Sequence, residues 1–278
     1  MQCREVITYL DELAPRAYAC EWDNPGFLAG REEKEIKKIL VALDATDEVV
    51  EQAIRQQADM LVTHHPLIFK PLKQVTDRNF ISRRIVELIQ ADICYFAMHT
   101  NFDIAPGCMA DLAAEKLGLL PEEPLEVTGE VTEEAAGEMI QKKTSAPIGI
   151  GKIGTLAEPV SVEILARRVK ERFDLPFVTV YGMEQVTEPV SRVAISPGSG
   201  GSMIGSAIEK KAQVLVTGDI GHHEGIDAAA NHMAVIDAGH YGLEHIFIPF
   251  MADYLKKLPE GDFEIVTALP AFPARVIC

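Results

Sequence analysis

Short apolar runs alternate along the chain with stretches whose apolar positions recur at helical spacing. Residues 39–43 and 60–63 are continuous apolar runs of strand length, and residues 47–57 between them show the helical pattern. Thr46 and Ser161 each stand directly before such a helical stretch, where we expect them to act as N-caps. The expected strands cover residues 39–43, 60–63, 93–97, 151–156, 176–181, 190–196, 213–217 and 233–237. The expected helices cover residues 5–13, 47–57, 81–90, 107–117, 161–173, 203–211 and 240–257.

This order of strands and helices predicts an α/β fold with mostly parallel sheets covered by helices. Residues 121–149 interrupt the alternation, because Pro121, Pro124 and several glutamates make the segment typical of a connection. The alternation then resumes. We therefore expect two similar α/β lobes, formed by residues 1–125 and 126–278.

Histidines gather at the ends of the expected strands. Six of the eight lie in four short polar segments, and each segment directly follows a strand. Ligands of open α/β sheets bind beyond the carboxyl ends of the strands. Two segments belong to each expected lobe, so the four converge if the lobes face each other. The segments are residues 63–66, 99–103, 217–224 and 237–244.

These segments contain residue types that bind metals. His240 and Glu244 are four residues apart, which places both on one face of a helix. His64 and His65 are adjacent, and a turn at the end of their strand lets both point at one centre or at two neighbouring ones. Asp103 can bridge two cations. Five such ligands exceed the four of a tetrahedral zinc site, so we expect a dinuclear metal site between the lobes.

Simpler explanations exist for each of these residues alone. A single histidine at a strand end is more often a hydrogen-bonded surface or core residue. The His240 and Glu244 pair is also compatible with an ordinary contact on a helix surface. The joint placement of four segments after four strands is what favours a metal.

Three further histidines are candidates for catalysis. His99 lies in one of the four segments, and His222 and His223 lie in another. Each can carry protons or orient a metal ligand, and for His222 and His223 direct ligation also stays open. We assign no role to His232 and His245.

A glycine-rich stretch, residues 197–202, follows the strand at 190–196 and precedes a helix. A dinucleotide-binding fingerprint requires a small residue at position 203, which is methionine here. Three interpretations stay open. Asp219 lies about 20 residues on, where the fingerprint has an acidic residue, so dinucleotide binding is the first of them. In the other two, the stretch is a plain tight turn, or it contacts a phosphate or oxyanion of the substrate beside the metals.

The charge of the chain limits the classes of partner that we expect it to bind. Lysine and arginine total 26 and aspartate and glutamate 42, a formal net charge of −16 that argues against nucleic acids and anionic membranes. Bound dications would still make a site locally positive, so phosphate-bearing substrates remain compatible. The five cysteines are scattered and form no CxxC pair, which predicts reduced thiols in a cytoplasmic protein. No apolar run reaches the length of a membrane span.

Together these segments resemble the Nif3-like family, also called DUF34, whose members are often named GTP cyclohydrolase 1 type 2 homologues. The resemblance covers about residues 1 to 250 and rests on blocks that include Thr-His-His-Pro at 63–66 and His-Thr-Asn-Phe-Asp at 99–103. It also rests on Gly-His-Tyr-Gly-Leu-Glu at 239–244. One departure is Asp219, where the resemblance leads us to expect glutamate in many relatives.

The resemblance has several implications. It implies two α/β lobes with a dinuclear site between them and a ring-shaped homohexamer whose sites face an inner cavity. Some longer members insert an extra domain between the lobes, and here the middle segment is too short for one. By position, the resemblance assigns the metals to His64, His65, Asp103, His240 and Glu244.

The sequence thus predicts a cytoplasmic, metal-dependent hydrolase of a small phosphorylated or nucleotide-like substrate. We expect two divalent ions per subunit, and zinc, iron, manganese and nickel suit the mixed ligands about equally. The alternative is a non-catalytic metal-binding, regulatory or chaperone protein assembled as a ring.

Overall fold

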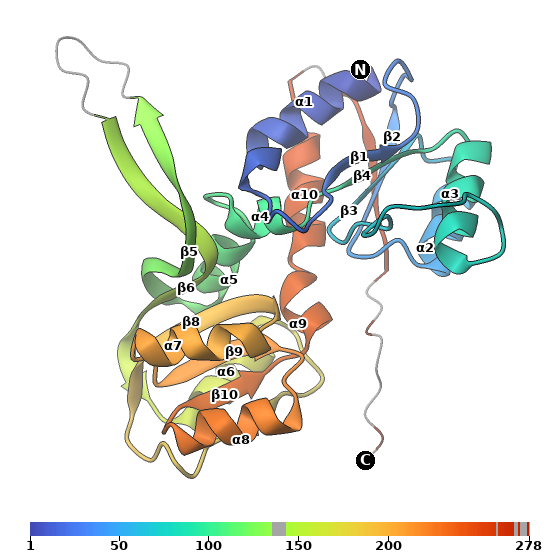
Figure 1. The fold of residues 1–278 in the computed structure, drawn as a ribbon. Coiled ribbons are helices and arrows are strands. Elements are labelled where there is room, and N and C mark those ends of the chain that lie inside the picture. The colour runs from blue at the N-terminus through green and yellow to red at the C-terminus, as the bar shows by residue number, and fades with distance from the viewer. Residues whose placement is uncertain (135–142, 260, 270–271, 273–276, 278) are drawn as a thin grey trace. The chain divides into compact units, whose positions relative to one another are not determined.

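The computed structural model describes residues 1–134, 143–259, 261–269, 272 and 277 (Figure 1). The chain forms two compact units. The first comprises residues 1–102 and 245–278, and the second comprises residues 103–244. Each unit is built around its own sheet.

The first unit contains a five-stranded sheet in the order β1-β4-β3-β2-β11. Its four strands from β4 to β11 are parallel, and β1 pairs with β4 in the antiparallel direction. The bounds are β1 Gly26–Ala29, β2 Lys38–Ala42, β3 Met60–Thr63, β4 Cys94–Ala97 and β11 Glu264–Thr267.

Helices cover both faces of this sheet. Helices α1 and α10 lie on one side, where the Tyr254 hydroxyl donates to the Tyr9 carbonyl at 2.8 Å, and α2 and α3 lie on the other (Figure 1). Buried residues of α2 and α3, such as Val50 and Leu88, pack on sheet residues that include Leu61. The bounds are α1 Cys3–Leu13, η1 Arg16–Tyr18, α2 Asp47–Arg55, α3 Phe80–Gln90 and α10 Phe247–Lys256. Helix α4, Thr100–Ile104, crosses the boundary between the units.

The second unit contains a six-stranded sheet in the order β5-β6-β8-β9-β10-β7. Strands β8, β9 and β10 are parallel, and the outer strands on both sides are antiparallel. The strands are β5 Leu119–Glu134, β6 Lys143–Val160, β7 Thr179–Tyr181, β8 Val190–Ser199, β9 Val214–Gly218 and β10 Ala234–Asp237. The helices are α5 Met109–Leu117, α6 Val162–Arg172, η2 Gly201–Met203, α7 Ile204–Glu209, α8 His222–Ala230 and α9 His240–Glu244.

The predicted α/β class is confirmed, and so are both predicted caps. The Thr46 hydroxyl accepts from the Val49 amide at 3.3 Å, and the Ser161 hydroxyl accepts from the Ile164 amide at 3.2 Å. Each predicted strand between residues 39 and 97 coincides with an observed strand to within a residue or so at each end.

The division of the chain differs from the expected boundary at residue 125. After α9 the chain returns to the first unit, where β11 pairs in parallel with β2. The helix expected over 240–257 is consequently two helices, α9 and α10, and the break between them coincides with the passage between units. The periodicity of a sequence does not show which sheet a strand near the C-terminus, such as β11, will join.

The segment expected to be a connection is part of a long hairpin formed by β5 and β6. Figure 1 shows this hairpin reaching beyond the other strands of its sheet. The prolines that suggested a connection, Pro121 and Pro124, lie on β5 at the edge of the sheet, and the register shifts between Pro121 and Glu123. Edge strands and bulges are where a strand tolerates proline. Residues 135–142, within the same segment, lie outside the described part of the chain.

In the described residues, we find no helix with both the length and the apolar character needed to cross a membrane.

Close packing explains the glycines after β8. The Gly200 amide donates to the Gly218 carbonyl at 3.0 Å, so the stretch runs directly against the end of β9. A side chain at position 200 would overlap Thr217, and one at position 201 would overlap the Glu224 carboxylate. This packing supports the tight-turn interpretation, while the phosphate contact stays a prediction.

Replacement of Gly200 by alanine should destabilise the second unit. The new Cβ would lie 2.5 Å from the Thr217 Cβ, a conflict that no rotamer relieves. Overpacking of this kind costs about 1–3 kcal/mol, which urea unfolding followed by circular dichroism would detect. Gly205→Ala is the control, because nothing lies within 4 Å of its added methyl group. That variant should unfold at the wild-type urea concentration or slightly above it, and unchanged stability of Gly200→Ala would contradict the packing argument.

Candidate metal centre

Three imidazoles come together in the first unit. His64 and His65 follow β3, and His99 follows β4. Their ring centroids are 4.8 Å apart for His64 and His65, 5.4 Å for His64 and His99, and 5.5 Å for His65 and His99. One ring nitrogen of each lies within 4.8 Å of the others, a spacing that can hold a metal ion. We refer to His64, His65 and His99 as the histidine cluster.

Sheet pairing creates this proximity. Strands β3 and β4 are parallel neighbours with Thr63 opposite Ala97, so the residues after both strands emerge at the same edge. The amides of His64 and His65 both donate to the Leu43 carbonyl, at 3.2 and 3.0 Å. Leu43 directly follows β2, the other parallel neighbour of β3, so the end of β2 fixes the turn after β3.

The buried Tyr95 hydroxyl also holds that turn. It accepts from the Leu67 amide at 2.8 Å and donates to the His65 carbonyl at 3.0 Å. Burial raises the pKa of Tyr95 to about 12, so the hydroxyl keeps its proton over the physiological range.

Each imidazole of the histidine cluster is oriented through its Nδ1 atom. A carbonyl or carboxylate oxygen only accepts, so Nδ1 carries the proton and Nε2 presents a lone pair. This is the arrangement by which proteins orient histidine ligands. The Nδ1 atoms of His64, His65 and His99 donate to the Met98 carbonyl, the Asp44 carboxylate and the Asp23 carboxylate, each at 2.7 Å.

Asp23 ties the histidine cluster to the start of α4. Its side chain is fully buried, and its second oxygen accepts from the Thr100 amide at 3.0 Å and from the Thr100 hydroxyl at 2.6 Å. Burial alone would raise the pKa of this carboxyl, but the hydrogen bonds and charge of His99 and the bonds from Thr100 lower it to about 2.

Asp23 and Asp44 are not among the site residues predicted from the sequence. Asp44 directly follows the expected strand 39–43, so the rule that found the histidines would also have found it. Asp23 lies in the loop before β1, where hydrophobic periodicity gives no indication of a functional residue.

The second unit has its own pair of donors on α9. His240 Nε2 lies 3.0 Å from the Glu244 carboxylate, and Nδ1 donates to Asp219 at 2.8 Å. Glu244 is buried, with 3% of its surface exposed. The pair expected from the four-residue spacing is thus present, and its histidine is oriented in the same way as those of the first unit.

The loops around this pair are also fixed. The Asp237 carboxylate accepts from the Ile220 amide at 3.0 Å and from the Gly239 amide at 2.9 Å, which joins the loops after β9 and β10. Gly198 has φ +82°, and a Cβ there would lie 2.5 Å from a Glu244 oxygen. The glycine-rich stretch therefore packs directly on Glu244.

Asp103 is half-buried on α4, four residues after His99. His222 and His223 are exposed at the start of α8, with ring centroids 5.3 Å apart. Neither of these two histidines belongs to a group of possible metal ligands in the described part of the chain. The roles expected for Asp103, His222 and His223 stay predictions.

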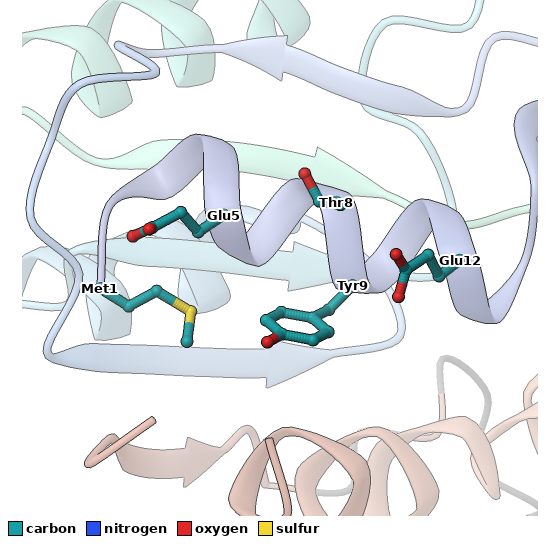
Figure 2. A pocket seen from close by; sticks show the side chains of 5 residues that line it. All are labelled: Met1, Glu5, Thr8, Tyr9 and Glu12. Carbon is teal, nitrogen blue, oxygen red and sulfur yellow. The ribbon is translucent and has the colours of Figure 1, made fainter. Parts of the chain in front are cut away.

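A pocket of about 400 Å³ lies along α1, and none of the candidate metal ligands lines it (Figure 2). Its lining offers carboxylates, two hydroxyls and a thioether, and no imidazole. We therefore do not associate it with the metal centre. The lining residues are Met1, Glu5, Thr8, Tyr9 and Glu12.

The buried Asp23 carboxylate should stabilise the first unit in a pH-dependent way. Its folded pKa of about 2 lies below the ordinary 3.8, so its contribution is complete well above pH 4 and is lost as the pH falls through 2. Asp23→Asn should cost about 2 kcal/mol at pH 7 and clearly less at pH 3, as measured by urea unfolding of chelator-treated protein. Asp253→Asn, an exposed control, should change stability by less than about 0.5 kcal/mol. An equal loss at both pH values for Asp23→Asn would refute the assignment.

Comparison with known proteins identifies relatives over nearly the whole chain. A family model described as Duf34/NIF3 (NGG1p interacting factor 3) matches residues 1–270. A GTP cyclohydrolase 1 type 2 homolog of Streptococcus pneumoniae is 32% identical over 273 residues, which cover 98% of this chain and 96% of that protein. A protein of the same name from Lactococcus lactis is 31% identical over 262 residues, 94% of each chain.

The fold agrees with this relationship. The crystal structure of a Bacillus cereus protein related to NIF3 matches with a TM-score of 0.82 at 25% identity, covering 100% of this chain and 99% of that chain. The resemblance inferred from the sequence motifs is therefore confirmed, and the chain belongs to the DUF34/NIF3 family.

Proposed function

We propose that the protein is a metal-dependent hydrolase of a small phosphorylated or nucleotide-like substrate. One observation carries the proposal: three clustered imidazoles each donate Nδ1 to a fixed acceptor, so Nε2 of each ring is the nitrogen that can bind a metal ion or accept a proton. A purely structural histidine has no need of two neighbours held in the same tautomer.

The donor chemistry fits divalent cations. Neutral imidazole nitrogens with carboxylate oxygens suit zinc, iron, manganese and nickel. In this proposal His64, His65, Asp103, His240 and Glu244 hold two such ions. Family membership supports combining the donors of both units. Paired divalent ions lower the pKa of water and stabilise developing charge on a phosphoryl or carbonyl oxygen.

His99, His222 and His223 are assigned to proton transfer. His99 donates Nδ1 to the buried, ionised Asp23, which fixes the direction of Nε2. His222 and His223 are exposed, so they can exchange protons with solvent. We assign these two a supporting role in proton transfer.

Metal analysis tests the proposal first. Protein purified with supplemented zinc, manganese or nickel should contain about two ions per chain by elemental analysis. His240→Ala should lose at least about half of this metal while retaining its fold, because the helix keeps its other contacts. His232→Asn is the matched control: position 232 has φ +57°, which asparagine tolerates, and should keep full occupancy.

Turnover then separates the two function classes. The loaded protein should hydrolyse at least one member of a panel of GTP, phosphoesters and nucleotide amides, and His99→Ala should reduce the rate by about 10²-fold or more. Full occupancy without turnover on this panel would favour the non-catalytic metal-binding alternative. Less than one ion per chain would overturn the dinuclear assignment.

We further propose that the chain assembles as a cytoplasmic homohexameric ring, as the family resemblance implies. Light scattering coupled to size-exclusion chromatography should give a mass of six times the 30.5-kDa chain. A monomeric mass at micromolar concentration would contradict the ring.

A further inference from the structure

Two exposed aromatic side chains stand beside the histidine cluster. Trp22 is 60% exposed and Phe69 is 42% exposed. Their ring centroids are 5.8 Å apart, and they lie 6.1 and 6.3 Å from the ring centroid of His99. Large aromatic residues usually bury most of their surface, so a neighbouring exposed pair needs an explanation.

The pair is held in place by hydrogen bonds of its own backbone segments. The Asn24 side-chain amide donates to the Ile68 carbonyl at 2.7 Å, which joins the loop of Trp22 to the loop of Phe69. Asp23, between Trp22 and Asn24, is bound to His99. Both aromatic side chains therefore extend from segments that are fixed to each other and to the histidine cluster.

The geometry leaves aromatic surface available. The Trp22 and Phe69 rings are inclined at 54°, and His99 meets them nearly edge-on, at 74° and 75°. None of the three pairs is stacked face to face, so these contacts do not cover the faces of the Trp22 and Phe69 rings. Flat aromatic rings bind well to such faces.

We infer that Trp22 and Phe69 form a subsite that binds the heteroaromatic ring of the substrate. The inference rests on the proposed function and names its substrate class: a molecule with a planar, nitrogen-containing ring system, as in a purine nucleotide. The exposed aromatic pair binds the ring, and the adjacent histidine cluster acts on the polar part of the molecule.

Local charge agrees with an anionic group on this ligand. Lys70 and Lys73 are both exposed and follow Phe69 in the same loop. In a chain of net charge −16, two lysines in the loop of Phe69 provide positive charge that favours phosphate, although the exposed Glu21 before Trp22 offsets part of it.

Trp22 is the only tryptophan of the chain, so its fluorescence reports directly on this subsite. Addition of GMP to the metal-loaded protein should quench the emission in a saturable way. Ribose 5-phosphate, which lacks the ring, should not. Phe69→Leu should weaken GMP binding about tenfold, and Phe69→Tyr should restore it, because a stacked base is bound by the face of the ring.

Phe80→Leu is the matched control. Phe80 is also exposed, at 55%, but lies on α3 against Arg84, outside the subsite. This variant should bind GMP like the wild type. Equal GMP affinity of Phe69→Leu and wild type would overturn the inference. Quenching by ribose 5-phosphate as strong as by GMP would do so too.

Metal content distinguishes the failure of this inference from the failure of the proposed function. Phe69→Leu should retain wild-type metal occupancy and unfolding midpoint. A wild-type protein that binds metal but shows no saturable quenching would refute the aromatic subsite alone. A wild-type protein without metal would refute the proposed function, whatever the outcome of the fluorescence titration.

Discussion

The parallel pairing of β2, β3 and β4 is the constraint on which the candidate centre depends. Because the three strands run in the same direction, the residues that follow them emerge at one edge of the sheet. Asp44, His64, His65 and His99 reach this edge from segments that are separated in the sequence. An antiparallel β3 would carry its two histidines to the opposite edge, so the imidazole spacing is a consequence of strand direction.

Strand direction brings the imidazoles together, and hydrogen bonds then set the direction of each ring. Asp23, Asp44 and Asp219 all accept an Nδ1 proton, and a carbonyl does the same for His64. Four rings in two separate units thus share one tautomer. Such uniformity is expected where Nε2 must be available to a ligand, because a histidine that only fills space has no preferred nitrogen.

The sequence predicted those parts of the fold that depend on local pattern. The strands from β2 to β4 are continuous apolar runs. Thr46 and Ser161 are recognisable as N-caps because each is a hydroxyl residue directly before a helical stretch. The return of the chain at Glu264–Thr267 was not predictable in this way, because its pairing with β2 is a long-range contact between residues far apart in sequence. The candidate ligands followed strand ends and could be found. Asp23, Trp22 and Phe69 lie in loops and became recognisable only through their contacts with His99.

Around the histidines, acidic side chains have a specific structural role. Three carboxylates there serve as acceptors for imidazole protons, and Asp23 remains ionised because its hydrogen bonds outweigh the effect of burial. Negative charge held in this way increases the electron density that imidazole offers to a cation and offsets part of the cation's charge. A net charge of −16 disfavours long polyanions such as nucleic acids, because their many phosphates meet a net repulsion. A single small phosphorylated molecule meets only the local field. In the proposed function, metal ions near the histidine cluster would set that field, so the overall acidity and a phosphorylated substrate are compatible.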